Sequence, residues 1–449
     1  MVISYPEEVK YIINTLKKHG FEGFLVGGSV RDSLLSIEPK DFDITTNALP
    51  EDVIQIFHKT IPTGIKHGTV TVIENSIPFE ITTYRVDGEY KDNRRPHKIK
   101  FVSTLKEDLA RRDFTINAFA YNEKYGLVDF FNGKKDLDLK LIHTVGDPDK
   151  RFQEDALRML RAIRFSCQLG FDIEKNTFSA IKRNCPLILN ISSERIRDEI
   201  TKIITSPSPS RGIRLLNSSG ILKLVLSDLH ALIGFDERVS YHKKDLFEHT
   251  LSVMEKVPNS IHLRLASLLH DIGKPGCFAL GSDGYGHFYN HENLSSEISK
   301  KILKKLRFDN NTIDKVSILI KEHMNILINP TDLSIKKLIN RVGKDLIFDL
   351  YELQSADIFS STVSNEFLEY LNYTENRTRE ILDSNVPLSI KDLKINGKIL
   401  MEALGLNPGK KLGIILDYLM ARVLDDPLLN NEKTLVMLGK EYYENSIQN

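Results

Sequence analysis

The hydrophobic and polar positions form two different patterns along the chain. Up to about Gly146, short runs rich in β-branched and aromatic residues alternate with turns and a few helical stretches, which predicts a small mixed sheet. From about Asp149 to the end, Leu and Ile recur at helical spacing instead. The chain is therefore predicted to be an α+β protein with several domains, in which a mixed-sheet head precedes an all-α remainder.

The elements expected in the head are short. Strands are expected at 24–26, 42–45, 69–73, 79–84 and 99–101, and helices at 1–20, 30–35 and 50–58. In the helical remainder, the Pro/Ser run at 206–210 predicts a break. A second helical block is expected from about Tyr241 to Ser360 and a third after Pro387.

A glycine turn after the first strand of the head indicates a phosphate site. Gly27 and Gly28 carry no Cβ, so a ligand can approach the backbone, and the N–H groups that open a helix bind phosphate. Asp41 and Asp43 lie two positions apart on strand-like sequence, so their carboxylates share one face and suit Mg²⁺. Each feature alone is more often a plain turn or a solvated strand end. Together they favour a phosphate loop beside a metal site.

Other polar residues of the head have two interpretations. Glu80, between apolar neighbours on a strand, is either a third carboxylate of the site or an ordinary edge-strand residue. Residues 84–112 carry an excess of positive charge, and the Gly88–Pro96 portion is expected to be a mobile loop, either solvated or a lid over phosphate. A short segment then gathers Arg111, Arg112, Asp113 and Asn117, which either contact phosphate and ribose or begin a helix with an exposed ion pair.

A helix is expected to begin at Arg151. Leu157, Leu160 and Ile163 supply its buried stripe. Another side carries Asp155, Arg158, Arg161 and Arg164. Ion pairs one turn apart usually stabilise a helix by roughly 0.2–0.5 kcal/mol. They can also present a fixed acceptor and a fixed donor to a nucleobase edge, and spacing alone leaves both interpretations open.

Charge and cysteine content exclude several classes of protein. Lys plus Arg and Asp plus Glu are 61 each, so the net charge is zero, which argues against a generally basic nucleic-acid-binding surface but permits local basic patches. The 3 cysteines are far apart and form no Cys-x-x-Cys, which indicates a reducing compartment without a disulfide framework. The N-terminus lacks the apolar core of a signal peptide, and no apolar run could span a bilayer. We therefore expect a cytoplasmic protein with no membrane partner.

In their order along the chain, these segments resemble the class II tRNA nucleotidyltransferases, that is, the bacterial CCA-adding enzymes and poly(A) polymerases of the polymerase-β superfamily. The motifs that carry the resemblance are Gly27-Gly28-x-x-Arg31-Asp32, Asp41-x-Asp43, Arg111-Arg112-Asp113-x-x-x-Asn117-Ala118, Asp129…Gly133, Glu154-Asp155-x-x-Arg158 and Ser193-Glu194-Arg195-Ile196-Arg197. Each motif alone is weak, but the ordered set is specific and covers about residues 20–220.

The resemblance implies an enzyme that adds the 3′-terminal CCA to tRNA from CTP and ATP without a nucleic-acid template. Asp41 and Asp43 would hold Mg²⁺ for attack of the tRNA 3′-hydroxyl on the nucleotide α-phosphate, and Glu80 would join them as a catalytic residue. The loop at 85–96 would help the switch from C to A addition.

The resemblance also implies roles for the nucleotide-binding residues. Gly27, Gly28 and Arg31 would bind the triphosphate, and Arg111, Asp113 and Asn117 would contact ribose and phosphates. Asp155 and Arg158 would read the Watson–Crick edge of CTP or ATP, with Arg161 and Arg164 on the same side. GTP and UTP would be excluded because they leave buried polar groups unpaired.

A His-Asp pair in the second helical block indicates another metal site. His270-Asp271 precedes Ile-Gly-Lys, with His249 upstream and Asp357 downstream, and this set resembles the HD superfamily of metal-dependent phosphohydrolases. The resemblance implies His249, His270, Asp271 and Asp357 as ligands of a divalent ion such as Mn, Ni, Fe or Mg. His291 and His323 could extend the site to a second metal. Its substrate would be a phosphomonoester or a 2′,3′-cyclic phosphate at an RNA end, unless the helices serve only as a body for tRNA.

The expected domains are a nucleotidyltransferase head at 1–148, a helical neck at 149–235, an HD domain at 236–375 and a tRNA-binding tail at 376–449. The alternatives are a CC- or A-adding enzyme, a poly(A) polymerase, an HD phosphohydrolase whose head only binds RNA, and a non-catalytic RNA scaffold. The loop between Tyr84 and Lys100 favours full CCA addition, and intact Asp41 and Asp43 argue against an inactive head. The sequence indicates no oligomeric state.

Overall fold

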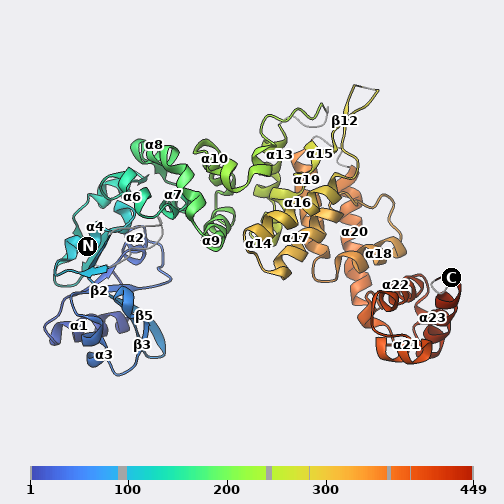
Figure 1. Ribbon diagram of the computed structural model, residues 1–449, viewed down its shortest axis with the longest axis horizontal. Helices are drawn as coiled ribbons and strands as arrows, with labels where there is room; N and C mark the ends of the chain where they lie inside the picture. Colours follow the sequence, from blue (N-terminus) through green and yellow to red (C-terminus); the bar gives the residue numbers. More distant parts are fainter. Residues whose placement is uncertain are drawn as a thin grey trace. The chain divides into compact units, whose positions relative to one another are not determined.

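A computed structural model of the chain describes residues 3–88, 99–238, 245–282, 284–361, 366–384 and 386–446. The chain divides into two units, Met1–Ser227 and Asp228–Asn449 (Figure 1). This boundary lies near the expected end of the neck at 235, and the finer division into four domains stays a prediction. Apart from Gly88, the predicted loop at Gly88–Pro96 lies outside the described residues. Within the described ranges, no helix has the length and apolar character needed to cross a membrane.

A seven-stranded mixed sheet forms the centre of the head, as predicted. Its strand order is β3-β4-β5-β2-β1-β8-β9, and every neighbouring pair is antiparallel except β2 and β5. The strands are β1 (Gly23–Val26), β2 (Asp43–Thr46), β3 (Thr60–Gly64), β4 (Thr69–Glu74), β5 (Ile77–Thr83), β8 (Phe119–Asn122) and β9 (Gly126–Asp129). Two further pairs lie outside this sheet: β6 (Arg85–Asp87) with β7 (Ile99–Phe101), and β10 (Leu141–Ile142) with β11 (Asp172–Ile173).

Short helices accompany this sheet. They are α1 (Glu7–Lys18), α2 (Gly28–Leu34), α3 (Pro50–Ile56), α4 (Leu105–Ala110) and α5 (Gly133–Asp138). The first three confirm the helices expected from the hydrophobic pattern, with ends shifted by a few residues. α1 is amphipathic and buries Val9, Ile12 and Leu16, which is the stripe that helical spacing predicts.

The strand register brings three segments to one edge of the sheet. β1 and β2 are antiparallel with Val26 opposite Asp43, so the turn after β1 lies beside the start of β2. β2 and β5 are parallel with Ile44 opposite Ile81, so Glu80 comes next to Asp43. The glycine turn and the acidic residues are therefore neighbours although they come from separate strands.

Helices make up most of the rest of the first unit. They are α6 (Pro148–Glu154), α7 (Leu157–Leu169), α8 (Lys175–Asn184), α9 (Ser193–Ile204), α10 (Pro209–Ser218) and α11 (Ile221–Val225), and α12 (Ser227–His230) lies at the unit boundary. The predicted break at 206–210 falls between α9 and α10.

The prediction of one continuous helix from Arg151 is wrong. α6 ends at Glu154, Asp155 is extended with φ −141° and ψ 104°, and α7 begins at Leu157. The Asp155 carboxylate accepts a hydrogen bond from the Leu157 N–H at 3.1 Å, and aspartate side chains favour such helix starts over helix interiors. The predicted stripe of Leu157, Leu160 and Ile163 is buried.

The second unit is helical, as predicted, except for one short hairpin of β12 (Ala279–Leu280) and β13 (Gly286–His287). Its helices are α13 (Leu246–Lys256), α14 (Ile261–Leu269), α15 (Lys274–Cys277), α16 (His291–Lys305), α17 (Asn310–Glu322), α18 (Asp332–Val342), α19 (Ile347–Ser360), α20 (Glu366–Asp383), α21 (Gly397–Leu404), α22 (Lys410–Asp425) and α23 (Glu432–Ser446). Figure 1 shows α13, α14, α16, α17 and α19 gathered into one bundle, in agreement with their mutual packing.

Candidate active site in the head and candidate metal centre

A cavity of about 420 Å³ opens between the sheet edge of the head and α7. Ten of its lining residues are predicted site residues: Gly27, Gly28, Arg31, Asp43, Arg111, Asp113, Asn117, Asp155, Arg158 and Arg161. Its volume falls within the range of ligand pockets. The structure thus brings together segments that are far apart in sequence. Asp41, Glu80 and Arg164 are predicted residues that do not line this cavity.

The acidic edge of the cavity centres on Asp43. The pKa of its carboxyl is raised, chiefly because the surrounding protein desolvates it; Arg112 opposes this shift, and the charges of Glu80 and Asp41 add to it. The negative charges of Glu80 and Asp41 therefore lie close enough to act on the Asp43 carboxyl. In the described part of the head, no three His, Cys, Asp or Glu side chains bring their potential metal-binding atoms within 4.8 Å of one another. The donor set still fits Mg²⁺, which is commonly held by one or two carboxylates and completed by substrate phosphates and water.

The backbone conformation and the close contacts at position 27 require a glycine. Its φ is +76°, and a Cβ there would lie 2.8 Å from the Arg112 Nη1 atom. The missing side chain lets the Arg112 guanidinium pack onto the turn, beside the N–H groups that begin α2. This places a positive charge at the predicted phosphate loop.

A chain of polar contacts links α2 to α7 through the segment after α4. Arg31 donates from Nη1 to the Asn117 side-chain oxygen at 2.6 Å, and Asn117 donates from Nδ2 to Asp113 Oδ1 at 3.0 Å. Arg161 donates from Nε to Asp113 Oδ2 at 2.7 Å. Burial alone would raise the pKa of the Asp113 carboxyl, but Arg161 and Asn117 together lower it to about 2. Asp113 is thus a fixed anion that orients residues on both sides of the cavity.

The two predicted base-reading residues already have partners in the protein. Asp155 accepts from both Arg195 terminal nitrogens, at 2.7 and 3.3 Å. Arg158 donates to Glu154 at 2.6 Å and to the Arg111 carbonyl oxygen at 3.1 Å. Because a guanidinium has five N–H donors and a carboxylate about four acceptor positions, each keeps capacity for a ligand. Their orientations are therefore set before a base arrives.

Four residues line the cavity that were not among the predicted site residues: Arg112, Leu157, Phe165 and Arg195. Arg112 and Arg195 stand inside motifs that the sequence singled out, so a spacing signal existed for them. Phe165 had no such signal, because a phenylalanine on a helix with apolar spacing is usually a core residue. Arg164, predicted at the site, instead pairs with Glu199 at 2.8 Å.

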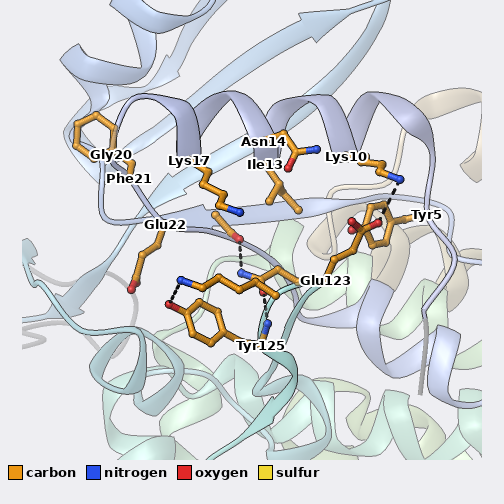
Figure 2. A pocket seen from close by; sticks show the side chains of 13 residues that line it. Tyr5, Lys10, Ile13, Asn14, Lys17, Gly20, Phe21, Glu22, Glu123 and Tyr125 are labelled. Atoms are coloured by element: carbon orange, nitrogen blue, oxygen red, sulfur yellow. Dashed lines mark hydrogen bonds and ion pairs between the residues drawn. The ribbon is translucent and has the colours of Figure 1, made fainter.

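A second cavity of the head, about 530 Å³, lies at the other end of β1 (Figure 2). Gly23 lines it, whereas Gly27 lines the first cavity, and four strand residues span about 13 Å. Two of its lysines already have partners: Lys10 pairs with Glu123 at 3.4 Å, and Lys124 donates to the Tyr125 hydroxyl at 2.9 Å. Asp43 and the predicted phosphate loop line the first cavity.

The second unit contains a compact cluster of histidines and aspartates. It consists of His249 in α13, His270 and Asp271 after α14, His291 at the start of α16, His323 after α17 and Asp357 in α19. The predicted ligands and both predicted extensions thus come together, and all but Asp357 are buried.

Asp271 stands at the middle of this cluster. Its Oδ2 atom faces His270 Nε2 at 3.2 Å and His249 Nε2 at 3.8 Å. Its Oδ1 atom faces His291 Nε2 at 3.1 Å and His323 Nε2 at 3.8 Å. One carboxylate thus points an oxygen at each of two histidine pairs, and its Oδ2 atom also pairs with Lys274 Nζ at 2.8 Å.

The histidine tautomers are set by backbone carbonyls. Nδ1 of His270, His291 and His323 lies 2.8, 2.8 and 2.6 Å from the carbonyl oxygens of Ser267, Phe288 and Ile320. A proton on Nδ1 leaves the lone pair on Nε2, and such contacts orient metal-binding histidines. These three Nε2 atoms are buried and point at the Asp271 carboxylate, from distances of 3.2, 3.1 and 3.8 Å. Imidazole nitrogens and carboxylate oxygens gathered this closely are a donor set that divalent metal ions bind, so the cluster fits a metal ion.

Comparison with protein families and known proteins agrees with this geometry. Residues 23–143 match the poly(A) polymerase head domain, residues 170–233 an RNA and SrmB-binding site of polymerase A, and residues 287–438 a tRNA nucleotidyltransferase domain 2. The chain is 32% identical over 452 residues to a CCA-adding enzyme of Ligilactobacillus salivarius, which covers all of both chains. It is 35% identical over 434 residues to a CCA-adding enzyme of Pediococcus pentosaceus, with 96% of each chain covered.

Solved structures show the same fold. A Bacillus stearothermophilus CCA-adding enzyme in complex with CTP superposes with a TM-score of 0.72 at 28% identity, over 99% of this chain and 100% of that one. A Thermotoga maritima CCA-adding enzyme complexed with tRNA has a TM-score of 0.56 at 21% identity, over 97% and 96% of the two chains, and shares the fold alone. The full-length sequence matches and the motifs gathered at one cavity lead to one conclusion: the chain belongs to the class II family of CCA-adding enzymes and poly(A) polymerases.

Proposed function

We propose that this protein adds the 3′-terminal CCA to tRNA from CTP and ATP. The observation that carries the proposal is the meeting of the glycine turn, Asp43, the Arg111–Asn117 segment and the Asp155–Arg158 segment in one cavity. The full-length relatives carry the name CCA-adding enzyme, which favours CCA addition over a CC-adding, A-adding or poly(A) polymerase activity. Such a tRNA-processing role would place the protein in the cytoplasm.

The family uses a divalent metal ion, and we propose Mg²⁺ at Asp41 and Asp43, with Glu80 beside them. When bound there, the ion would favour the ionised tRNA 3′-hydroxyl and offset charge on the departing pyrophosphate. The backbone N–H groups of Gly27 and Gly28 and the Arg31 guanidinium would orient the triphosphate so that its α-phosphate faces that hydroxyl.

The remaining lining residues would place the nucleoside. Arg111, Asp113 and Asn117 would contact ribose and phosphates, and Asp113 would keep its negative charge throughout. Asp155 and Arg158 would offer an acceptor and a donor to the base. Arg161, held by Asp113, would add a donor on the same side. Because these side chains are held in place, a base with the wrong edge would leave them unpaired.

The test is tRNA extension with defined 3′ ends. The protein would be incubated with tRNAs that end at the discriminator base, at C and at CC, with CTP and ATP supplied separately and together. We expect CCA, CA and A to be added, respectively, when both nucleotides are present. Addition that stops after CC, or that occurs only on the CC end, would instead indicate a CC- or A-adding enzyme.

We further propose that the second unit contains an HD-type metal-dependent phosphohydrolase site. Support comes from the position of Asp271 between two histidine pairs and from the buried Nε2 atoms of His270, His291 and His323, which point at its carboxylate. His249, His270, Asp271 and Asp357 would hold one divalent ion, and Asp271 with His291 and His323 a second. The cluster borders an open cavity of about 470 Å³, through which a phosphate ester could enter.

The chemical class to be tested is a phosphomonoester or a 2′,3′-cyclic phosphate at an RNA end. The protein would be stripped with a chelator, reloaded separately with Mn²⁺, Ni²⁺, Fe²⁺ or Mg²⁺, and incubated with p-nitrophenyl phosphate and with an RNA that ends in a 2′,3′-cyclic phosphate. We expect release of product with at least one metal. If none of the ions binds with measurable affinity, the cluster would be part of a helical body for tRNA.

A further inference from the structure

We infer that Phe165 is a positioning residue of the nucleotide site, because its ring contacts three arginines, two of which line the cavity. The inference rests on the proposed nucleotidyl transfer. It assigns to this side chain a role that neither its apolar character nor its helical spacing suggests.

The ring of Phe165 lies among three guanidinium groups. The Cζ atom of Arg164 is 4.2 Å from the ring centroid, that of Arg31 is 5.1 Å away and that of Arg161 is 5.4 Å away. All three distances fall within the range of about 6 Å in which a cation is attracted to an aromatic ring. Phe165 is only 6% exposed, so solvent screens these interactions little.

The ring itself is held by packing. Phe114 meets it edge-on, with ring centroids 5.8 Å apart and an interplanar angle of 82°. This T-shaped contact is a favoured aromatic geometry. Phe114 comes directly before η2 (Thr115–Asn117), so the same segment that supplies Asp113 and Asn117 to the cavity also seats the ring.

The three arginines have anionic partners on three different elements. Arg31 pairs with Asp32 of α2, Arg161 with Asp113 of the segment after α4, and Arg164 with Glu199 of α9. Three like charges thus converge on one side chain. Repulsion between the three guanidinium groups would push them apart, and the electron-rich ring of Phe165 is a contact that all three share.

The consequence for the cavity concerns Arg31 and Arg161. Both line it, one on the side of the predicted triphosphate loop and the other on α7. A leucine at position 165 would fill much of the volume but would offer no electron-rich surface, so both guanidinium groups would gain freedom. Nucleotide binding would then include the entropy loss of ordering these two side chains, which the ring now orders before the nucleotide binds.

The test compares Phe165→Leu with Phe165→Tyr, which keeps the ring. Steady-state kcat and KM would be measured for CTP and ATP on tRNA ends, and the dissociation constant of inorganic tripolyphosphate would be measured on the full chain. We expect Phe165→Leu to raise KM for both nucleotides and the tripolyphosphate dissociation constant by roughly 10-fold, which corresponds to about 1.4 kcal/mol. We expect kcat to stay within about 3-fold, because the carboxylate pair is untouched, and Phe165→Tyr to remain close to the wild type.

Phe152→Leu is the matched control, since Phe152 is fully buried in the same unit and no cation contact is described for it. It should lower the melting temperature without raising KM. If Phe165→Leu does not fold, Phe165→Met replaces it with a more adaptable apolar side chain. Unchanged KM values in the folded Leu or Met variant, or a Tyr variant as weak as Leu, would overturn the inference. Absence of nucleotide addition by the wild type would overturn the proposed function instead.

Discussion

Asp113→Asn should destabilise the first unit in a way that depends on pH. The substitution keeps the shape of the side chain but removes the charge that joins Arg161 to the Asn117–Arg31 contact. Asp113 is 8% exposed, so the loss is poorly compensated by water. The expected result is a less stable chain at neutral pH and a difference from the wild type that shrinks in acid.

The size of the effect follows from the pKa of the carboxyl. Its ordinary value of 3.8 is lowered to about 2 in the folded chain, which corresponds to about 2 kcal/mol of stability. A lowered pKa means that this stability is present above the unfolded-state value and is lost as the pH falls through the folded-state value. From pH 5 to pH 3 the wild type should therefore lose about 1 kcal/mol that the Asn variant does not lose.

Urea unfolding of the full chain, followed by far-UV circular dichroism at pH 7, 5 and 3, measures the difference. Asp172→Asn is the control, because Asp172 forms an exposed pair with Arg211 and such pairs contribute roughly 0–1 kcal/mol. A stability difference between wild type and Asp113→Asn that is the same at pH 5 and pH 3 would refute the reasoning.

Three further predictions concern base choice, the metal cluster and tRNA binding. Asp155→Ala or Arg158→Ala should reduce discrimination against UTP and GTP by roughly 10- to 100-fold in competition assays, more than either variant slows addition of one correct nucleotide. An unchanged nucleotide preference would exclude the template role. Arg195→Ala is the control, because it removes the ion pair of Asp155 but keeps the Asp155 acceptor. His270→Ala should remove metal-dependent phosphatase activity and spare nucleotide addition. The control is His262→Ala, which alters a histidine paired with Asp349 and should spare both activities. Loss of both activities in the His270 variant would mean that the two sites are not separate. Because the net charge is zero, tRNA binding should depend on local basic patches, and log affinity should fall linearly with log salt in filter-binding assays; affinity independent of salt would contradict this.

The local features of the head could be predicted because they depend on nearby residues. The glycine turn and the short strand before it follow from backbone preferences. Asp41 was expected on one strand with Asp43, but β2 begins only at Asp43. β8 was not predicted, because it pairs with β1 nearly a hundred residues earlier and its four residues carry little pattern of their own. The helix break at Asp155 was also missed. Apolar spacing continues through it, whereas Asp155 is extended and its side chain accepts a hydrogen bond from the Leu157 N–H at the start of a new helix.

In the candidate sites, too, the sequence indicated some residues, whereas others became evident only from the packing of separate elements. Charged residues in ordered motifs identified most of the cavity, whereas Phe165 carries no charge and acts through arginines on two elements. In the second unit, the sequence indicated the histidines and aspartates of the cluster. It could not indicate that Asp271 faces two histidine pairs with its two oxygens, because that depends on how five helices pack.

The most direct test of the account is extension of a tRNA that ends at the discriminator base by the wild type and by Asp43→Ala, with tRNA binding measured in parallel. The wild type should add C, C and A from CTP and ATP and should incorporate neither GTP nor UTP. Asp43→Ala should bind the tRNA equally well and add no nucleotide. Incorporation retained by the Asp43 variant would contradict the central claim that this carboxylate serves the transfer reaction.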